Sequence, residues 1–204
     1  MSRITLGLCC LFYGLLASFS ASAAPLVLQD KEAGYSISFS AGWQTVPEGL
    51  LKFAVEAQAK EMGLSDPDAG RAQGAMIIDG KTGFFTMYMI ISFPLDVLDG
   101  HLGGIREAAK GDRQMLDRFK QEMEKAMLET GASILDSQTV EKGYCQNSSE
   151  RDASLPVGQL MFRRLCVRFT DSAMITYTGV HPGAPSDTFD ADFQTIIDSV
   201  QFTR

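Results

Sequence analysis

Apolar and polar positions repeat with two different periods along the chain, and these periods predict where strands and helices lie. Tyr35, Ile37 and Phe39 alternate with serines, which is the period of a half-buried strand. Residues 84–94 are apolar on both faces, as expected of a central strand. Further strands are expected at residues 26–28, 75–79, 134–142, 159–170 and 173–180.

Three other segments repeat apolar residues at steps of three and four, which is the period of an amphipathic helix. They cover residues 48–62, 104–129 and 189–200, and Gly131 is a natural stop for the second. Hairpin-forming strands with helices between them favour an α+β fold, in which helices flank a largely antiparallel sheet. We expect a single domain over residues 24–204.

The first residues have a different pattern. Arg3 precedes an apolar run, and the small residues Ala21 and Ala23 follow that run. This order is typical of a secretory signal peptide, here residues 1–23 with cleavage after Ala23. The run is shorter than the ~20 residues that a membrane-spanning helix needs. We therefore expect a periplasmic protein that does not span the membrane after cleavage.

Composition and motifs exclude several functions. The 204 residues carry 18 Lys and Arg against 25 Asp and Glu, a net charge of −7. Loss of Arg3 with the signal peptide would leave 17 against 25, or −8. An acidic chain is a poor match for nucleic acid, whose binding needs a basic face. The sequence also lacks a nucleophile elbow, a zinc-protease motif and a phosphate-binding loop, so we predict neither catalytic residues nor a cofactor.

Two cysteines, Cys145 and Cys166, would remain after signal cleavage. An even number in an exported protein predicts a disulfide, although two unrelated buried thiols are the alternative. The polar residues 146–158 between them are interpreted as the long loop of a hairpin. If the cysteines face each other, the turn falls near residues 153–156, where turn-forming residues occur.

This hairpin is also the best candidate for contact with a partner, because loops on a rigid scaffold often carry binding. Arg164 and Arg168 share one face of the following strand and form a basic spot in an acidic chain, while Arg163 points to the other face. An exposed hairpin tip without function is the alternative. The candidate contact residues are Asn147, Glu150, Arg151, Arg164 and Arg168.

Two histidines are the remaining candidates for chemistry. His101 lies in a glycine-rich turn near Asp96 and Asp99, which makes it a candidate metal ligand or simply part of a helix start. His181 could be grouped with Ser172 and Asp187 as a catalytic triad by residue type alone. Any chain rich in serine and aspartate permits such a trio, so no metal or triad is predicted.

The segment from Tyr35 to Trp43, a strand that runs through a short turn into a tryptophan, resembles the opening signature of the PsbP-like family. One departure is Ser40, where relatives typically have proline. The C-terminal apolar pattern is similar to the closing helix and last apolar residue of that family, and consists of Phe189, Phe193, Ile196, Val200 and Phe202.

The resemblance to these PsbP- and DcrB-type exported proteins implies an α-β-α sandwich and an accessory or binding role, mostly without enzymatic activity. Trp43 and the closing phenylalanines are expected to be core residues, so the resemblance implies no catalytic residue in this chain. Our leading hypothesis is an exported periplasmic accessory protein without catalytic activity, which acts by protein–protein or ligand binding and has an envelope protein as its expected partner. The alternatives are an immunity protein that neutralises an envelope-targeted toxin, and an enzyme with an unrecognised site around His101 or His181.

Overall fold

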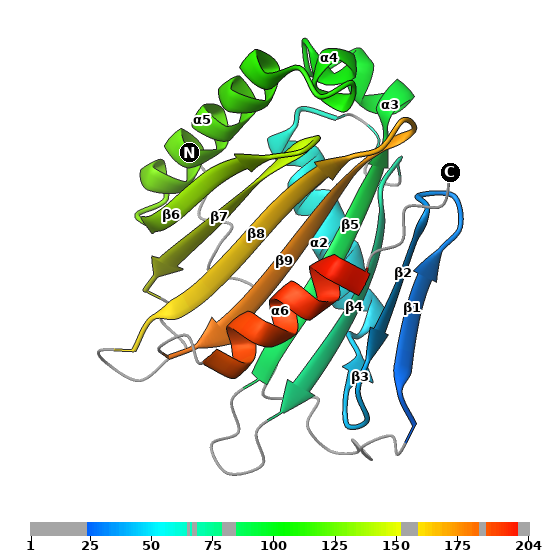
Figure 1. Cartoon of the computed structure of the whole chain (residues 1–204), viewed down its shortest axis with the longest axis vertical. Helices are drawn as coiled ribbons and strands as arrows, with labels where there is room; N and C mark the ends of the chain where they lie inside the picture. The colour runs from blue at the N-terminus through cyan, green and yellow to red at the C-terminus, as the bar shows by residue number, and fades with distance from the viewer. Residues whose placement is uncertain are drawn as a thin grey trace.

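The structure is a computed structural model, which describes residues 24–64, 66, 69–78, 85–151, 159–183 and 187–199. In these residues, one antiparallel sheet has the strand order β3-β4-β5-β9-β8-β7-β6, and β1 and β2 form a separate hairpin (Figure 1). The strands are β1 (Leu26–Asp30), β2 (Tyr35–Phe39), β3 (Gln44–Thr45), β4 (Arg71–Ile78), β5 (Phe85–Pro94), β6 (Ser133–Val140), β7 (Gly143–Glu150), β8 (Met161–Phe169) and β9 (Ala173–Pro182). The helices are α2 (Glu48–Glu61), α3 (Leu95–Asp99), α4 (Ile105–Ala109), α5 (Arg113–Glu129) and α6 (Asp187–Ser199).

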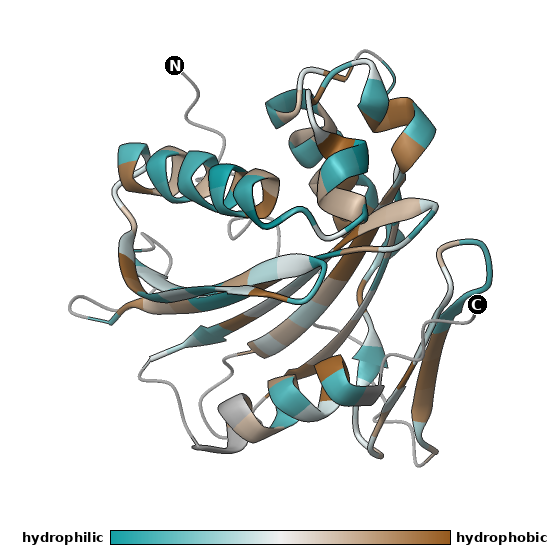
Figure 2. Cartoon of the chain, turned by 45° about the horizontal axis from the view of Figure 1, so that its top comes forward, coloured by the Kyte–Doolittle hydropathy of each residue, from teal (hydrophilic) through white to brown (hydrophobic). Residues whose placement is uncertain are grey.

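Both faces of the large sheet carry other elements. The β1–β2 hairpin and α6 lie on one face, whereas α2 and α5 lie on the other (Figures 1 and 2). Each face has its own apolar cluster, built around Ile37, Tyr88 and Phe193 on the first and around Val55, Phe93 and Leu116 on the second. The predicted class, α+β with an antiparallel sheet flanked by helices, is therefore confirmed.

The two terminal motifs of the sequence meet at one residue of the central strand β5. The Tyr88 ring lies 5.1 Å from the Trp43 ring and 5.8 Å from the Phe189 ring, which is stacked on it. Phe39 and Phe193 complete the group, at 6.1 and 5.9 Å from Tyr88. Aromatic pairs at these separations contribute about 0.5–1.5 kcal/mol each beyond the area that they bury. Trp43, Phe189 and Phe193 are buried core residues, as the resemblance implies, and Phe202 lies outside the described residues.

The helix predicted over residues 104–129 is wrong as a single element, because the chain forms two helices there. Gly111 has a φ of 87°, a left-handed conformation that ends α4. The carboxylate of Asp112 then accepts a hydrogen bond from the backbone N–H of Met115 and caps α5. The apolar period continues across the break because both helices bury residues in the same cluster.

The loop predicted over residues 146–158 is also wrong in its first part. Residues up to Glu150 belong to β7, and Gln146 and Ser148 are each only 2% exposed. Polar composition predicts exposure, but these residues lie on the side of β7 that α5 covers, where Gln146 contacts Met127. The expected turn at 153–156 lies outside the described residues, as does the predicted signal peptide. The strand β4 also begins at Arg71, four residues before the expected start, and α3 was not predicted.

Gly179 on β9 offers a test of the aromatic packing. A Cβ at this position would lie 2.8 Å from Cδ2 of Phe193 and 2.9 Å from Cε1 of Tyr88. Gly179→Ala should therefore lower the free energy of unfolding by about 1–3 kcal/mol, the usual cost of overpacking a core. Urea unfolding measures this change. Gly49→Ala is the control, since a Cβ there would meet nothing within 4 Å; equal loss in both variants would contradict the packing.

Candidate functional site

A groove of about 140 Å³ lies where α6 borders the strands β6, β7 and β8. The helix α5 packs on the opposite side of β6 and β7, so the groove side of these strands remains accessible (Figure 2). We call it the disulfide groove, after the bond in its wall. The residues that define it are Gln138, Cys145, Asn147, Arg164, Arg168 and Phe193.

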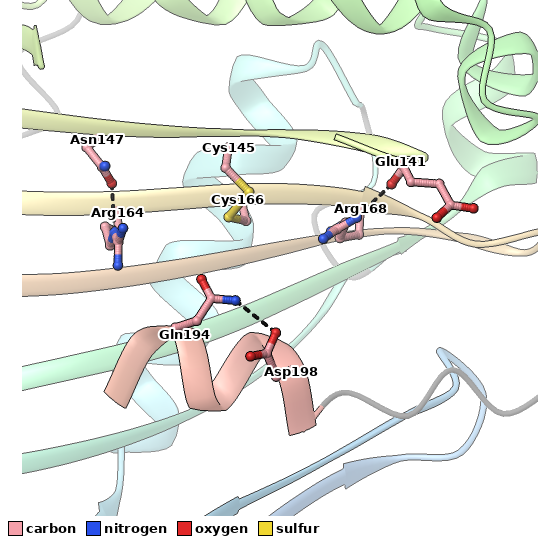
Figure 3. The surroundings of a disulfide bond; sticks show 8 residues. All are labelled: Glu141, Cys145, Asn147, Arg164, Cys166, Arg168, Gln194 and Asp198. Carbon is pink, nitrogen blue, oxygen red and sulfur yellow. Dashed lines mark hydrogen bonds between the residues drawn. A yellow bond between two sulfur atoms is a disulfide. The ribbon is translucent and has the colours of Figure 1, made fainter. Parts of the chain in front are cut away.

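Cys145 on β7 and Cys166 on β8 form a disulfide in this groove (Figure 3). The two residues are directly opposite each other in the antiparallel register, with their Cα atoms 4.1 Å apart. This is the pairing that the sequence predicts. The Cys166 side is buried and the Cys145 side is partly exposed, so the bond ties the two strands together at the groove surface.

Two arginines lie on either side of the disulfide along β8. The Nε atom of Arg164 donates to Oδ1 of Asn147 at 2.9 Å, and its guanidinium lies 5.4 Å from the centre of the Phe193 ring. The Nη1 atom of Arg168 donates to the backbone carbonyl of Glu141 at 2.6 Å (Figure 3). These contacts fix the direction of both guanidiniums, whose planar shape suits carboxylate groups.

The predicted contact residues divide between two faces. Asn147, Arg164 and Arg168 come together in the disulfide groove. Glu150 instead lies on the α5 side of β7, where its carboxylate accepts a hydrogen bond from Arg163 at 2.6 Å. Arg151 is exposed beyond the end of the strand. Asn147 lies within β7 rather than in a loop.

Sequence reasoning missed the part of the groove that comes from other elements. Gln138 on the edge strand β6 pairs with Cys145, and Phe193 of α6 forms the opposite border. The apolar period of α6 predicts that Phe193 is buried but does not say against which strands. The pairing of β6 with β7 requires residues 143–150 to form a strand, which their polar composition does not indicate.

A second and larger hollow, about 360 Å³, lies at the end of the sheet where the β1–β2 and β8–β9 turns approach α3 and α4. We call it the charged cleft, defined by Glu32, Arg71, Ser92, Asp96, Arg106 and Asp171. Sequence patterns do not predict this cleft, because its residues come from five separate segments of the chain.

The surroundings of His101 do not bring the expected carboxylates together around it. The Asp99 carboxylate accepts a hydrogen bond from Nε of Arg106 at 2.6 Å, and Asp96 accepts one from the backbone of Val97. His101 itself is exposed in the turn between α3 and α4. In the described part of the chain, no three His, Cys, Asp or Glu side chains are placed to hold a metal ion.

His181 is held in a structural contact. Its Nδ1 atom lies 2.9 Å from Oγ1 of Thr86, and its ring stacks on Phe189 at 5.2 Å. Ser172 precedes the first residue of β9, whereas His181 is near its last, and a strand rises ~3.3 Å per residue. The two side chains therefore lie roughly 30 Å apart, so the triad with Ser172 is wrong.

Comparison with known proteins shows similarity at the level of structure. No protein-family model matches the chain, and no curated protein matches its sequence. The solution structure of cyanobacterial PsbP from Synechocystis sp. PCC 6803 is similar, with a TM-score of 0.42 and 16% identity, over 92% of this chain and 99% of that one. Similarity at this level does not assign a family, so PsbP-like membership stays a prediction. Within the described residues, no helix is long and apolar enough to cross a membrane.

The disulfide should contribute measurably to stability. It closes a loop with a sequence separation of 21, for which the chain-entropy model gives about 3 kcal/mol. Replacing both cysteines by alanine should lower the free energy of unfolding by about that amount. Urea unfolding of the variant and of wild-type protein measures the difference.

Mass spectrometry of the protein purified from its native compartment should show no free thiol, and two alkylatable cysteines would contradict the bond.

The burial of His181 predicts a pH dependence of stability. Burial lowers the pKa of His181 below its usual value of 6.5. The unfolded chain then binds a proton at this residue more readily than the folded protein, so stability falls as the pH drops below about 6.5. Unfolding experiments between pH 5 and 8 on wild type and His181→Gln isolate this contribution. We expect a smaller loss of stability on acidification in the variant, and parallel curves would refute the assignment.

Proposed function

We propose that this chain is an exported binding protein without catalytic activity, which contacts an envelope protein through the disulfide groove. The observation that carries the proposal is the pair Arg164 and Arg168, held in fixed directions on either side of a disulfide on an accessible sheet face. A surface of this kind can bind without rearranging, which reduces the entropy lost on association.

The chemistry of the groove favours an acidic segment of the partner. Charged hydrogen bonds between guanidinium and carboxylate are stronger than neutral ones, and arginine is enriched among the residues that dominate interfaces. Ile197 of α6, which is partly exposed, adds an apolar border against which the partner can pack. Asp136 on β6 lies at the opposite border and would oppose a partner placed in the wrong register.

Two further observations support the proposal. One concerns the lack of catalysis and the other concerns export. The cysteines of the groove are joined, so they do not supply a thiolate, and no histidine is among the residues that line it. Disulfides persist in oxidising compartments, in agreement with the signal peptide expected at residues 1–23.

Affinity capture from the native envelope extract tests this function. Arg164→Gln with Arg168→Gln removes two positive charges from the groove. Arg113→Gln with Arg118→Gln removes two from exposed positions on α5, on the opposite side of the sheet, and serves as the control. We expect wild type and control to capture the same envelope protein, and the groove variant to capture at least about tenfold less, since each charged hydrogen bond contributes about 1.5–3 kcal/mol.

Two results would count against the proposal. An empty capture by the wild-type protein under gentle conditions would remove the binding role. Equal capture by the groove variant and the control would move the contact away from the groove. Urea unfolding of both variants shows whether they are folded, because Arg164 also contacts Phe193.

A further inference from the structure

We infer that the charged cleft binds a small zwitterionic molecule, of the class of amino acids and short peptides with free termini. This site is separate from the disulfide groove and does not depend on the proposed partner. Its volume of about 360 Å³ lies within the range of small-molecule pockets, which is about 300–1,000 Å³.

One edge of the cleft is the turn between β1 and β2 together with the start of β4. Arg71 at that start forms an ion pair with Glu32, and its Nη1 atom also lies 3.6 Å from Oδ1 of the buried Asp30. The Arg71 side chain is nevertheless 51% exposed, so it can reach a ligand in the cleft. This edge therefore presents a guanidinium and a carboxylate side by side.

The other edge comes from α3 and α4. The Nε atom of Arg106 donates a hydrogen bond to Asp99 at 2.6 Å. The Arg106 side chain is 50% exposed, so the other end of its guanidinium can contact a ligand. Asp96 on α3 is close enough to contribute to the raised pKa of Arg106, although the hydrogen bond to Asp99 is the larger cause. Both signs of charge are thus present on this edge as well.

The floor between these edges is made of small and apolar groups. Ala33, Leu95 and Ala173 are buried there, as is Ser92 on β5. The backbone N–H of Leu95 donates to the carbonyl of Ser172 at 2.8 Å, which ties α3 to the turn before β9. A floor of small and apolar side chains leaves room for a short ligand backbone or small apolar groups, and the hydrogen bond keeps its shape fixed.

The balance of charge decides which ligand fits. Two arginines and three carboxylates line the cleft, namely Arg71, Arg106, Glu32, Asp96 and Asp171. A simple anion would approach the carboxylates, and a simple cation would approach the guanidiniums. A zwitterion can place its carboxylate at one guanidinium and its ammonium at a carboxylate of the other edge, so both of its charges are satisfied.

A titration with L-alanyl-L-alanine tests the inference, with NMR chemical shifts of the ¹⁵N-labelled protein as the readout. We expect the amides of Ala33, Ser92 and Leu95 to shift, with a dissociation constant in the millimolar range or tighter. The N-acetylated dipeptide lacks the ammonium group and the dipeptide amide lacks the carboxylate. Each should bind at least about tenfold more weakly, because one charged hydrogen bond is lost.

Variants of the two charges on the α3–α4 edge locate the site. The double variant Arg106→Gln with Asp96→Asn removes the charge on this edge that either orientation of the dipeptide would contact, so it should weaken binding at least about tenfold. Arg118→Gln on α5, also an exposed arginine paired to a carboxylate, should leave binding unchanged. Equal binding of the blocked dipeptides, shifts confined to other regions, or no shift at high millimolar dipeptide would each overturn the inference. None of these results bears on capture through the disulfide groove, so the two proposals fail separately.

Discussion

The packing of four aromatic rings around Tyr88 is the constraint on which the arrangement of one whole sheet face depends. Tyr88 lies in the central strand β5, and its neighbours come from β2, from the turn after it and from α6. This contact fixes the β1–β2 hairpin and the last helix over the middle strands of the sheet. Because α6 is held there, its Phe193 borders the disulfide groove and β6 to β8 remain accessible. The same contact places the β1–β2 turn at the end of the sheet, where it forms one edge of the charged cleft.

The alternation of side chains along each strand then determines which polar residues line the disulfide groove. Cys145, Asn147 and their partners on β8 face α6, whereas Gln146 and Ser148 face α5. The two faces of the same strand therefore differ: one is part of an accessible basic surface, and the other holds buried polar groups. On the buried side, Gln146 contacts the Met127 sulfur of α5, and the Glu150–Arg163 ion pair is mostly shielded. A shift of β7 by one residue would exchange the two sets and bury the groove residues under the helix.

The sequence predicts those elements in which the apolar residues are also the buried ones. In β2 the apolar residues are buried and the serines are not, so the strand and its inner face follow directly. In β7 the period of two is present, but its buried positions are polar, and hydrophobicity alone assigns them to a loop. The break between α4 and α5 depends on one backbone angle at Gly111, which an apolar period of helical length does not reveal. The disulfide follows from the even number of cysteines in a chain expected to be exported, supported by turn-forming residues midway between them. The charged cleft was not predictable, because its charges meet only through tertiary contacts between separate turns.

The partners that hold the arginines are the reason why we propose different ligands for the two sites. In the groove, Arg168 is held by the backbone carbonyl of Glu141, a neutral acceptor, so this bond orients the guanidinium without compensating its charge. In the cleft, Arg71 and Arg106 are held by carboxylates, which orient them and offset their charge at the same time. The first arrangement would attract an acidic segment. In the second, each guanidinium has a carboxylate beside it, which would favour a ligand that carries both signs of charge. In an acidic chain, the type of group that positions each arginine therefore determines what that arginine can recognise.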